Sequence, residues 1–261
     1  MADWSLGSGV ERPDFYVAAM GRSGSTMLCN WLSRPPGQLV FVEPFFTRAS
    51  NPRLLRIQLE DFGLAANEGE WTREVGTAEE RFRNLMAPRL QGRRWAFKEV
   101  LAEEHVRVLE SFRPRAVLLT VRDIADVALS FFEKHRLQGN LDRFDDEWVA
   151  RYCVREAAGL VAFRDLLKVR DVPFLVVRYE EFTASPSKQQ EVAEFVGWEP
   201  GGRIDAHLDR FDRGFEVERH GEQISPVRRV PGDRALGSDL IDAAAAIERR
   251  CATYQQAFGY A

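Results

Sequence analysis

The hydrophobic residues of this chain fall into short, nearly continuous runs that alternate with longer stretches of periodic apolar positions. Short apolar runs without polar interruption predict β-strands that are covered on both faces, as in a parallel sheet. The sequence predicts such strands at residues 15–20, 39–42, 94–98, 115–121 and 173–177.

The stretches between these runs predict helices, because their apolar residues recur every three or four positions. After the first strand this spacing is carried by Leu28, Trp31 and Leu32. Residues 52–91 are predicted to be mostly helical around a loop at 66–71, with one apolar face formed by Ala78, Phe82, Leu85, Met86 and Leu90. Four further helices are expected: one with His105, Val106, Leu109 and Phe112 on its core face, one that begins at the N-cap Asp123, one over 145–169, and one from Ser185 to Gly197.

Strands alternate with helices from residue 15 to 197, and a last helix is predicted over 239–256. This order predicts an α/β fold of three α/β/α layers around a mostly parallel sheet. A chain of 261 residues can form one domain of this class. We therefore expect a single domain over 1–261 with a helical insertion at about 45–92.

The charge and the cysteine content of the chain exclude several classes of protein. Lys and Arg total 36 against 40 Asp and Glu, a net charge of −4, which argues against a general binder of nucleic acid or anionic membranes. The 3 cysteines are widely spaced, and neither they nor the 4 histidines show metal-ligand spacing. With no basic, apolar leader and no long apolar run, we expect a soluble cytoplasmic protein without a transmembrane segment.

The turn at residues 21–26 carries the clearest chemical signal. Two glycines, the cation Arg22 and the hydroxyl residues Ser23, Ser25 and Thr26 lie between a predicted strand and a predicted helix. The first N–H groups of a helix lack intrahelical acceptors and carry partial positive charge, so such a turn favours a phosphate or sulfate. The alternative is a Ser/Gly turn that merely begins a helix.

Other polar residues follow the predicted strands. Glu43 ends the second, Lys98 and Glu99 end the third, and Arg122 ends the fourth. Ligands of open α/β sheets gather at these carboxyl ends, although an acid or a lysine there can also be an ordinary surface residue. The turn differs from a nucleoside-triphosphate loop, because Ser25 stands where that loop has its lysine.

These motifs together resemble the sulfotransferases that use 3′-phosphoadenosine 5′-phosphosulfate (PAPS), a family with a P-loop-like α/β/α fold. The family's 5′-phosphosulfate loop is similar to residues 22–26, which end in Ser23-Gly24-Ser25-Thr26. Its second motif, an arginine followed eight residues later by a serine, resembles Arg122 and Ser130. A third, R-Y-E-[DE] after a strand, resembles residues 178–181, and the terminus Phe258-Gly259-Tyr260 is also similar.

The resemblance implies roles for these residues. Arg22, Ser23, Gly24, Ser25 and Thr26 would hold the 5′-phosphosulfate, Arg122 and Ser130 the 3′-phosphate, and Tyr179 would lie near the adenine. A basic segment with Arg228, Arg229 and Gly232 would close over the 3′-phosphate, or it is a solvated loop. No metal is implied.

The sequence departs from the phenol and steroid branch of that family. Met27 stands where that branch has tryptophan, and Lys98-Glu99-Val100 replaces its K-T-H-like histidine motif. The pattern is closer to bacterial and carbohydrate-type members, in which a glutamate follows the loop helix. We therefore expect Glu43 to be the general base, with Glu99 as runner-up. Lys98 is expected to add a catalytic cation or to be a surface lysine.

The predicted function is thus sulfuryl transfer from PAPS to a hydroxyl of a small-molecule, carbohydrate or lipid acceptor. Two alternatives remain open: a P-loop kinase or nucleotide phosphotransferase with Asp123 as its metal carboxylate, and a non-catalytic nucleotide-binding protein. Acceptor specificity is expected to depend on residues 45–90 and 200–225. The sequence identifies neither the acceptor nor the oligomeric state, for which a homodimer is one option.

Overall fold

A five-stranded parallel sheet forms the centre of the molecule in the computed structural model, which describes residues 9–48, 55, 58–60, 62–64, 77–201 and 236–260. The strand order is β2-β3-β1-β4-β5, and every neighbouring pair is parallel. The strands are β1 (Phe15–Ala19), β2 (Gln38–Val42), β3 (Arg94–Glu99), β4 (Val117–Val121) and β5 (Phe174–Arg178). The predicted strands and the α/β class are confirmed.

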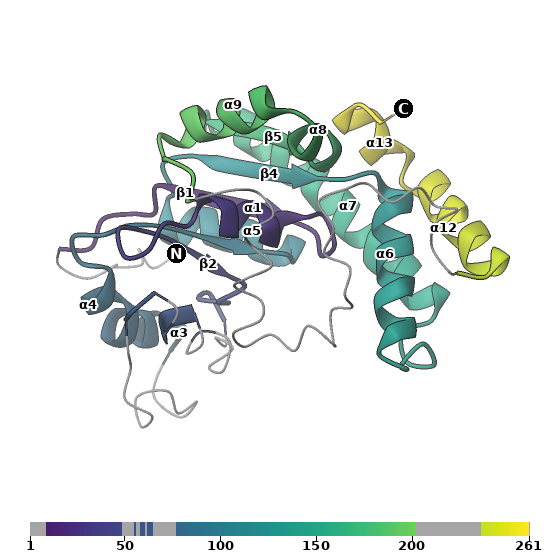
Figure 1. Ribbon diagram of the computed structural model, residues 1–261, viewed down its shortest axis with the longest axis horizontal. Coiled ribbons are helices and arrows are strands. Elements are labelled where there is room, and N and C mark those ends of the chain that lie inside the picture. The colour runs from purple at the N-terminus through teal and green to yellow at the C-terminus, as the bar shows by residue number, and fades with distance from the viewer. Residues whose placement is uncertain are drawn as a thin grey trace.

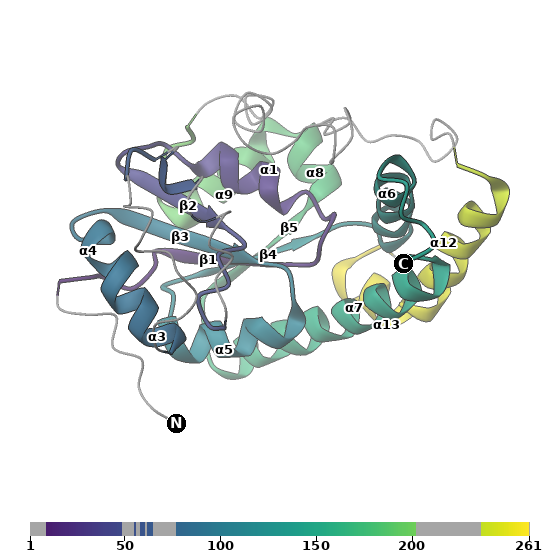
Figure 2. The same ribbon diagram turned by 90° about the horizontal axis from the view of Figure 1, so that it is seen from below.

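Helices cover both faces of the sheet and give the three predicted layers (Figure 1 and Figure 2). One face carries α1 (Ser25–Leu32), α8 (Tyr179–Ala184) and α9 (Pro186–Val196), and the other carries α5 (Ala102–Phe112) and α7 (Asp146–Val169). Beyond the end of β4, α6 (Ile124–Leu137) packs against α7 and α12 (Ser238–Arg250), and α13 (Ala252–Phe258) packs against α7. Three short consecutive helical segments, α3 (Ala78–Arg81), η2 (Phe82–Met86) and α4 (Ala87–Leu90), lie beside the β2–β3 edge (Figure 1).

The apolar side chains of β1 alternate between the two faces of the sheet, which explains why helices pack on both faces. Phe15 and Val17 enter the apolar cluster beneath α1, α8 and α9, whereas Tyr16 and Ala18 enter the larger cluster beneath α5 and α7. All five β1 residues are buried. A strand buried on both faces reads as a continuous apolar run, which is the pattern from which the strands were predicted.

Some helix predictions need correction. Val106 was expected on the core face of its helix, but it is 38% exposed, and Val108 is buried there instead. The last helix is broken at Cys251 into α12 and α13. Residues 45–92, predicted to form a helical insertion, are described only in part, and the single-domain prediction stays a prediction.

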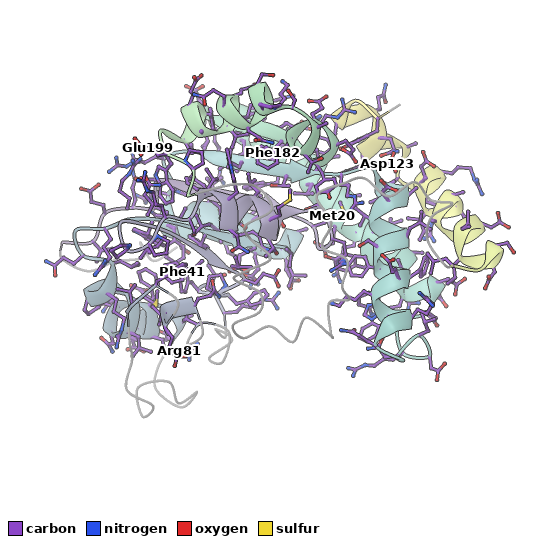
Figure 3. All side chains as sticks on the ribbon, in the orientation of Figure 1. Met20, Phe41, Arg81, Asp123, Phe182 and Glu199 are labelled. Carbon is purple, nitrogen blue, oxygen red and sulfur yellow. The ribbon has the colours of Figure 1, made fainter. Side chains whose placement is uncertain are left out.

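The strand ends bring the predicted motifs to one edge of the sheet. Because all strands are parallel, the residues that follow them meet at the carboxyl edge. Met20, directly after β1, and Asp123, two residues after β4, lie at this same end of the sheet (Figure 3). From β2 to β5, the order along the edge is Glu43, Lys98 and Glu99, the 21–26 turn, Arg122, and Tyr179.

Candidate active site

The turn after β1 has a backbone shape that depends on its glycines. Gly24 has φ +80°, a left-handed conformation that suits glycine, and a Cβ there would lie 2.2 Å from Tyr179 Cδ2. Gly21 donates its N–H to Tyr152 Oη at 2.8 Å. Arg22 also has a positive φ, +68°, although it carries a side chain. Positive φ at such a residue costs about 1–2 kcal/mol and is typical of functional sites.

The turn leads into the N-terminus of α1, as predicted. The N–H groups of the first helical turn, at Ser25 and Thr26, have no intrahelical acceptors and can face an anion. Ser23 is fully buried, and its hydroxyl donates to the Met20 carbonyl at 2.8 Å. The Ser23 side chain therefore stabilises the turn, while Ser25 and Thr26 lie where the helix begins.

Arg22, in the turn after β1, contacts both residues of the second motif, Arg122 and Ser130. Its Nε donates to Ser130 Oγ on α6 at 2.9 Å, and its carbonyl accepts from Arg122 Nη1 at 3.3 Å. The Arg122 guanidinium stacks over the Tyr179 ring at 4.4 Å, and the ring in turn lies against Gly24. Arg122 Nε is buried and has no hydrogen-bond partner among the described residues. The structure thus gathers the predicted donor-binding residues into one cluster, with Arg22 between Ser130 and Arg122.

The backbone of Arg122 is held by a residue that the sequence did not single out. Tyr254, on α13, accepts from the Arg122 N–H at 3.2 Å and donates to the Arg122 carbonyl at 3.0 Å. Burial, above all, raises the pKa of the Tyr254 hydroxyl, so it stays protonated and can donate. No sequence signal pointed to this contact, because it joins positions 132 apart.

On the other side of the turn, Lys98 is buried between two polar groups. It is 1% exposed, and its Nζ donates to Glu43 Oε1 at 2.7 Å and to Thr26 Oγ1 at 3.0 Å. The surface-lysine alternative for Lys98 is therefore wrong. The Glu43 side chain is 32% exposed, and its backbone has φ +52°. Glu43 thus combines a fixed cationic neighbour with access from outside.

Glu99, the runner-up base, has a different environment. It is fully buried, and its Oε1 accepts from the Phe45 N–H at 2.7 Å. Burial first, and the charge of Glu43 second, raise the pKa of Glu99 well above its usual value. Glu99 therefore retains its proton to higher pH than an exposed glutamate does.

Asp123 caps α6, as predicted. Its Oδ1 accepts from the N–H groups of Ala125 and Asp126 at 2.9 and 3.3 Å, and Gln255 Nε2 lies 3.4 Å from its Oδ2. Both carboxylate oxygens are therefore engaged within the protein.

Lys134 is a further residue of the site that the sequence analysis missed. It lies one helical turn after Ser130 on α6, and residues four apart share a helix face. Burial, followed by the charge of Arg22, lowers the pKa of the half-buried Lys134 amine, and Glu43 raises it. The spacing from Ser130 was the available signal.

The remaining expectations fall partly outside the described residues. Arg228, Arg229 and Gly232 lie there, as does most of the 200–225 region. Among the described residues, no group of three His, Cys, Asp or Glu side chains could hold a metal ion. No helix in that part of the chain is both long and apolar enough to cross a membrane.

Comparison with known proteins identifies the fold. No model of a protein family matches the chain, and no curated protein sequence matches it. A solved sulfotransferase from Alicyclobacillus acidocaldarius is 15% identical, with a TM-score of 0.51 over 95% of this chain and 96% of that one. Sulfotransferase STF9 from Mycobacterium avium is 18% identical, with a TM-score of 0.53 over 95% of this chain and 77% of the other. The chain has the fold of these bacterial sulfotransferases.

Proposed function

We propose that this protein is a sulfotransferase that moves a sulfuryl group from PAPS to a hydroxyl of an acceptor molecule. The observation that carries the proposal is the cluster in which Arg22 contacts both Ser130 and Arg122. It places two cationic side chains and a helix N-terminus at adjoining strand ends, and a nucleotide with anionic groups at both ends of adenosine needs two anion sites. The fold shared with bacterial sulfotransferases supports the same function.

The residues present fit this donor. Arg122 Nε is buried without a partner among the described residues, and an anion would satisfy it. The turn at Gly24 admits no side chain because Tyr179 fills that space. Arg22 and the first N–H groups of α1 would hold the phosphosulfate. Arg122 with Ser130 would hold the 3′-phosphate, and Tyr179 would lie beside the base.

Glu43 is the proposed general base. When bound, PAPS supplies an activated sulfuryl group. Glu43 removes the proton from the acceptor hydroxyl while the acceptor O–S bond forms and the S–O bond to the 5′-phosphate breaks. Lys98 holds Glu43 in place through their 2.7 Å contact. Arg22 neutralises the charge that develops on the sulfuryl and leaving oxygens. None of these roles requires a metal.

The kinase alternative has less support. It needs a carboxylate for magnesium, and both oxygens of Asp123 are engaged by Ala125, Asp126 and Gln255. The loop lysine of a nucleoside-triphosphate site is replaced by Ser25. A non-catalytic binding protein would keep the donor cluster, but it would not need Glu43 beside a buried lysine.

Calorimetry with 3′-phosphoadenosine 5′-phosphate (PAP) and with AMP tests the proposal, since the two differ only in the 3′-phosphate. We expect PAP to bind about 10- to 100-fold more tightly, as for a charge-assisted hydrogen bond. Arg122→Ala should remove this preference. The control Arg34→Ala changes an exposed arginine, with 57% of its side chain accessible, and should retain it. Equal binding of PAP and AMP would rule out the second anion site.

A further inference from the structure

Among the cations of the site that the structure describes, Lys134 is the one to which the proposed donor binding assigns no role. Arg22 and Arg122 face the two proposed anion positions of the donor, and Lys98 is occupied by Glu43 and Thr26. The Lys134 amine forms no hydrogen bond or ion pair with any of the described residues.

The position of Lys134 is on the Glu43 side of the cluster. Its neighbour one turn earlier, Ser130, contacts Arg22 at 2.9 Å, so this face of α6 points toward the turn after β1. The charged groups that act on the Lys134 amine are Arg22 and Glu43. Arg122, at the opposite side of the turn, is not among them. Lys134 also lies ten residues after Ile124, where α6 begins beside Arg122, which is about 15 Å along the helix axis. It is therefore farther from the proposed 3′-phosphate position than Ser130 is.

The residue after Lys134 adds no second charge. His135 stacks against the rings of Phe131 and Phe144, with centroids 6.1 and 4.1 Å away, and its Nδ1 bonds to Asn140. Burial, above all, lowers the pKa of His135, which keeps it neutral. Of these two neighbouring residues, only Lys134 therefore adds a positive charge to α6.

Burial and the charge of Arg22 disfavour the ionised form of the Lys134 amine, and a bound anion would offset both effects. We propose that Lys134 binds an anionic group of the acceptor, so that the preferred acceptors are small hydroxyl compounds carrying a carboxylate or phosphate. The inference rests on the proposed function. It assigns to α6 a role in acceptor selection, while Glu43 takes the proton from the hydroxyl.

Matched pairs of compounds test this inference on the full chain saturated with PAP. One pair is p-nitrophenyl β-D-glucuronide and p-nitrophenyl β-D-glucoside, which differ in a carboxylate. A second is glycerol 3-phosphate and glycerol. We expect the anionic member of at least one pair to bind about tenfold more tightly. Lys134→Met should abolish that preference, whereas Lys168→Met, on an exposed part of α7, should leave it intact.

Two results would overturn the inference. One is a set of pairs in which no anionic member is preferred, including a set without any binding. The other is a loss of PAP affinity in Lys134→Met, because it would assign the lysine to the donor. The PAP-to-AMP ratio of the unmodified protein is measured first. A protein that prefers PAP but not the anionic compounds keeps the proposed function and loses only this inference.

Discussion

Glu43 and Glu99 lie at the same edge of the sheet but differ in solvent exposure and in charged neighbours. Glu43 follows β2 with a partly exposed side chain that forms an ion pair with Lys98, whereas Glu99, at the end of β3, is fully buried. Glu43 has a cationic partner at 2.7 Å in Lys98, whereas burial favours the neutral form of Glu99. This difference in environment supports the proposal that Glu43, and not Glu99, is the base.

The first prediction concerns that assignment. Glu43→Gln keeps the size and one hydrogen-bond acceptor of the side chain but removes its basicity. We expect the rate of sulfuryl transfer to fall about 10²- to 10⁴-fold while PAP affinity is unchanged. Single-turnover kinetics and calorimetry on the same preparation measure both.

The matched control is Glu99→Gln, because a buried neutral glutamate and a glutamine are nearly isosteric. The amide oxygen can still accept from the Phe45 N–H. This variant should therefore transfer sulfuryl at nearly the normal rate. If Glu99→Gln lost activity and Glu43→Gln retained it, the base would be Glu99.

At the residue scale, the sequence located the charged groups of the edge but not their contacts. Lys98 could be placed at a strand end, but its burial depends on the positions of Thr26 and Glu43, which both accept a hydrogen bond from its amine. Ser130 was paired with Arg122 by motif, and the structure places it against Arg22. Side-chain partners of this kind depend on the tilt of α6 against the sheet, which local sequence does not encode.

At the scale of elements, the C-terminal helix α13 supports the cluster of predicted donor-binding residues around Arg22 and Arg122. Tyr254 holds both backbone polar groups of Arg122. Tyr260, after the helix, donates to Glu180 Oε2 at 2.7 Å, and Glu180 Oε1 accepts from the Asp123 N–H at 3.0 Å. The end of the described chain is thus bonded to the ends of β4 and β5.

The second prediction tests Tyr254 as a positioning residue. Tyr254→Phe removes the hydroxyl and leaves the Arg122 N–H without this partner, a loss of about 1–3 kcal/mol. If the hydroxyl fixes the position of Arg122, the preference for PAP over AMP should fall severalfold. Calorimetry with both nucleotides measures the ratio, and chemical denaturation measures the stability.

Tyr16→Phe provides the comparison. Tyr16 is likewise a fully buried tyrosine, but it bonds to His105 beneath the sheet rather than to Arg122. It should lower stability by a similar amount and leave the PAP-to-AMP ratio unchanged. A drop in the ratio in both variants would mean that Tyr254 acts only through global stability.

The elements themselves could be predicted well. Strands buried on both faces leave continuous apolar runs, and Asp123 marks the start of α6 by its capping chemistry. The break between α12 and α13 at Cys251 was missed, because Arg249, Arg250 and the residues after them favour a continuous helix.

At the scale of the whole molecule, the strand order decides which residues share the site. Strand β1 lies between β3 and β4, so the turn after it has Lys98 on one side and Arg122 on the other. The sequence predicted parallel strands but not this order, because each crossover helix permits more than one neighbour. The order explains how residues far apart along the chain form one site.

The last prediction concerns how the stability of the whole protein depends on pH. His105 is fully buried, and burial lowers its pKa to about 3. Below pH about 6.5 the unfolded chain binds a proton there that the folded protein does not, so acid destabilises the fold. Glu99 acts in the opposite direction. Its pKa is raised, so above pH about 4.3 the unfolded chain loses a proton that the folded protein retains, and stability falls as the pH rises.

Glu99→Gln separates these two effects, because it removes the ionisable group and leaves His105 in place. The variant should match the unmodified protein near pH 4 and become more stable than it toward pH 7, by at most about 1.4 kcal/mol for each pH unit. Urea denaturation at several pH values measures the difference. A difference that does not change with pH would show that Glu99 ionises in the folded protein much as it does in the unfolded chain. Its burial would then no longer support the proposal that Glu43, and not Glu99, is the base.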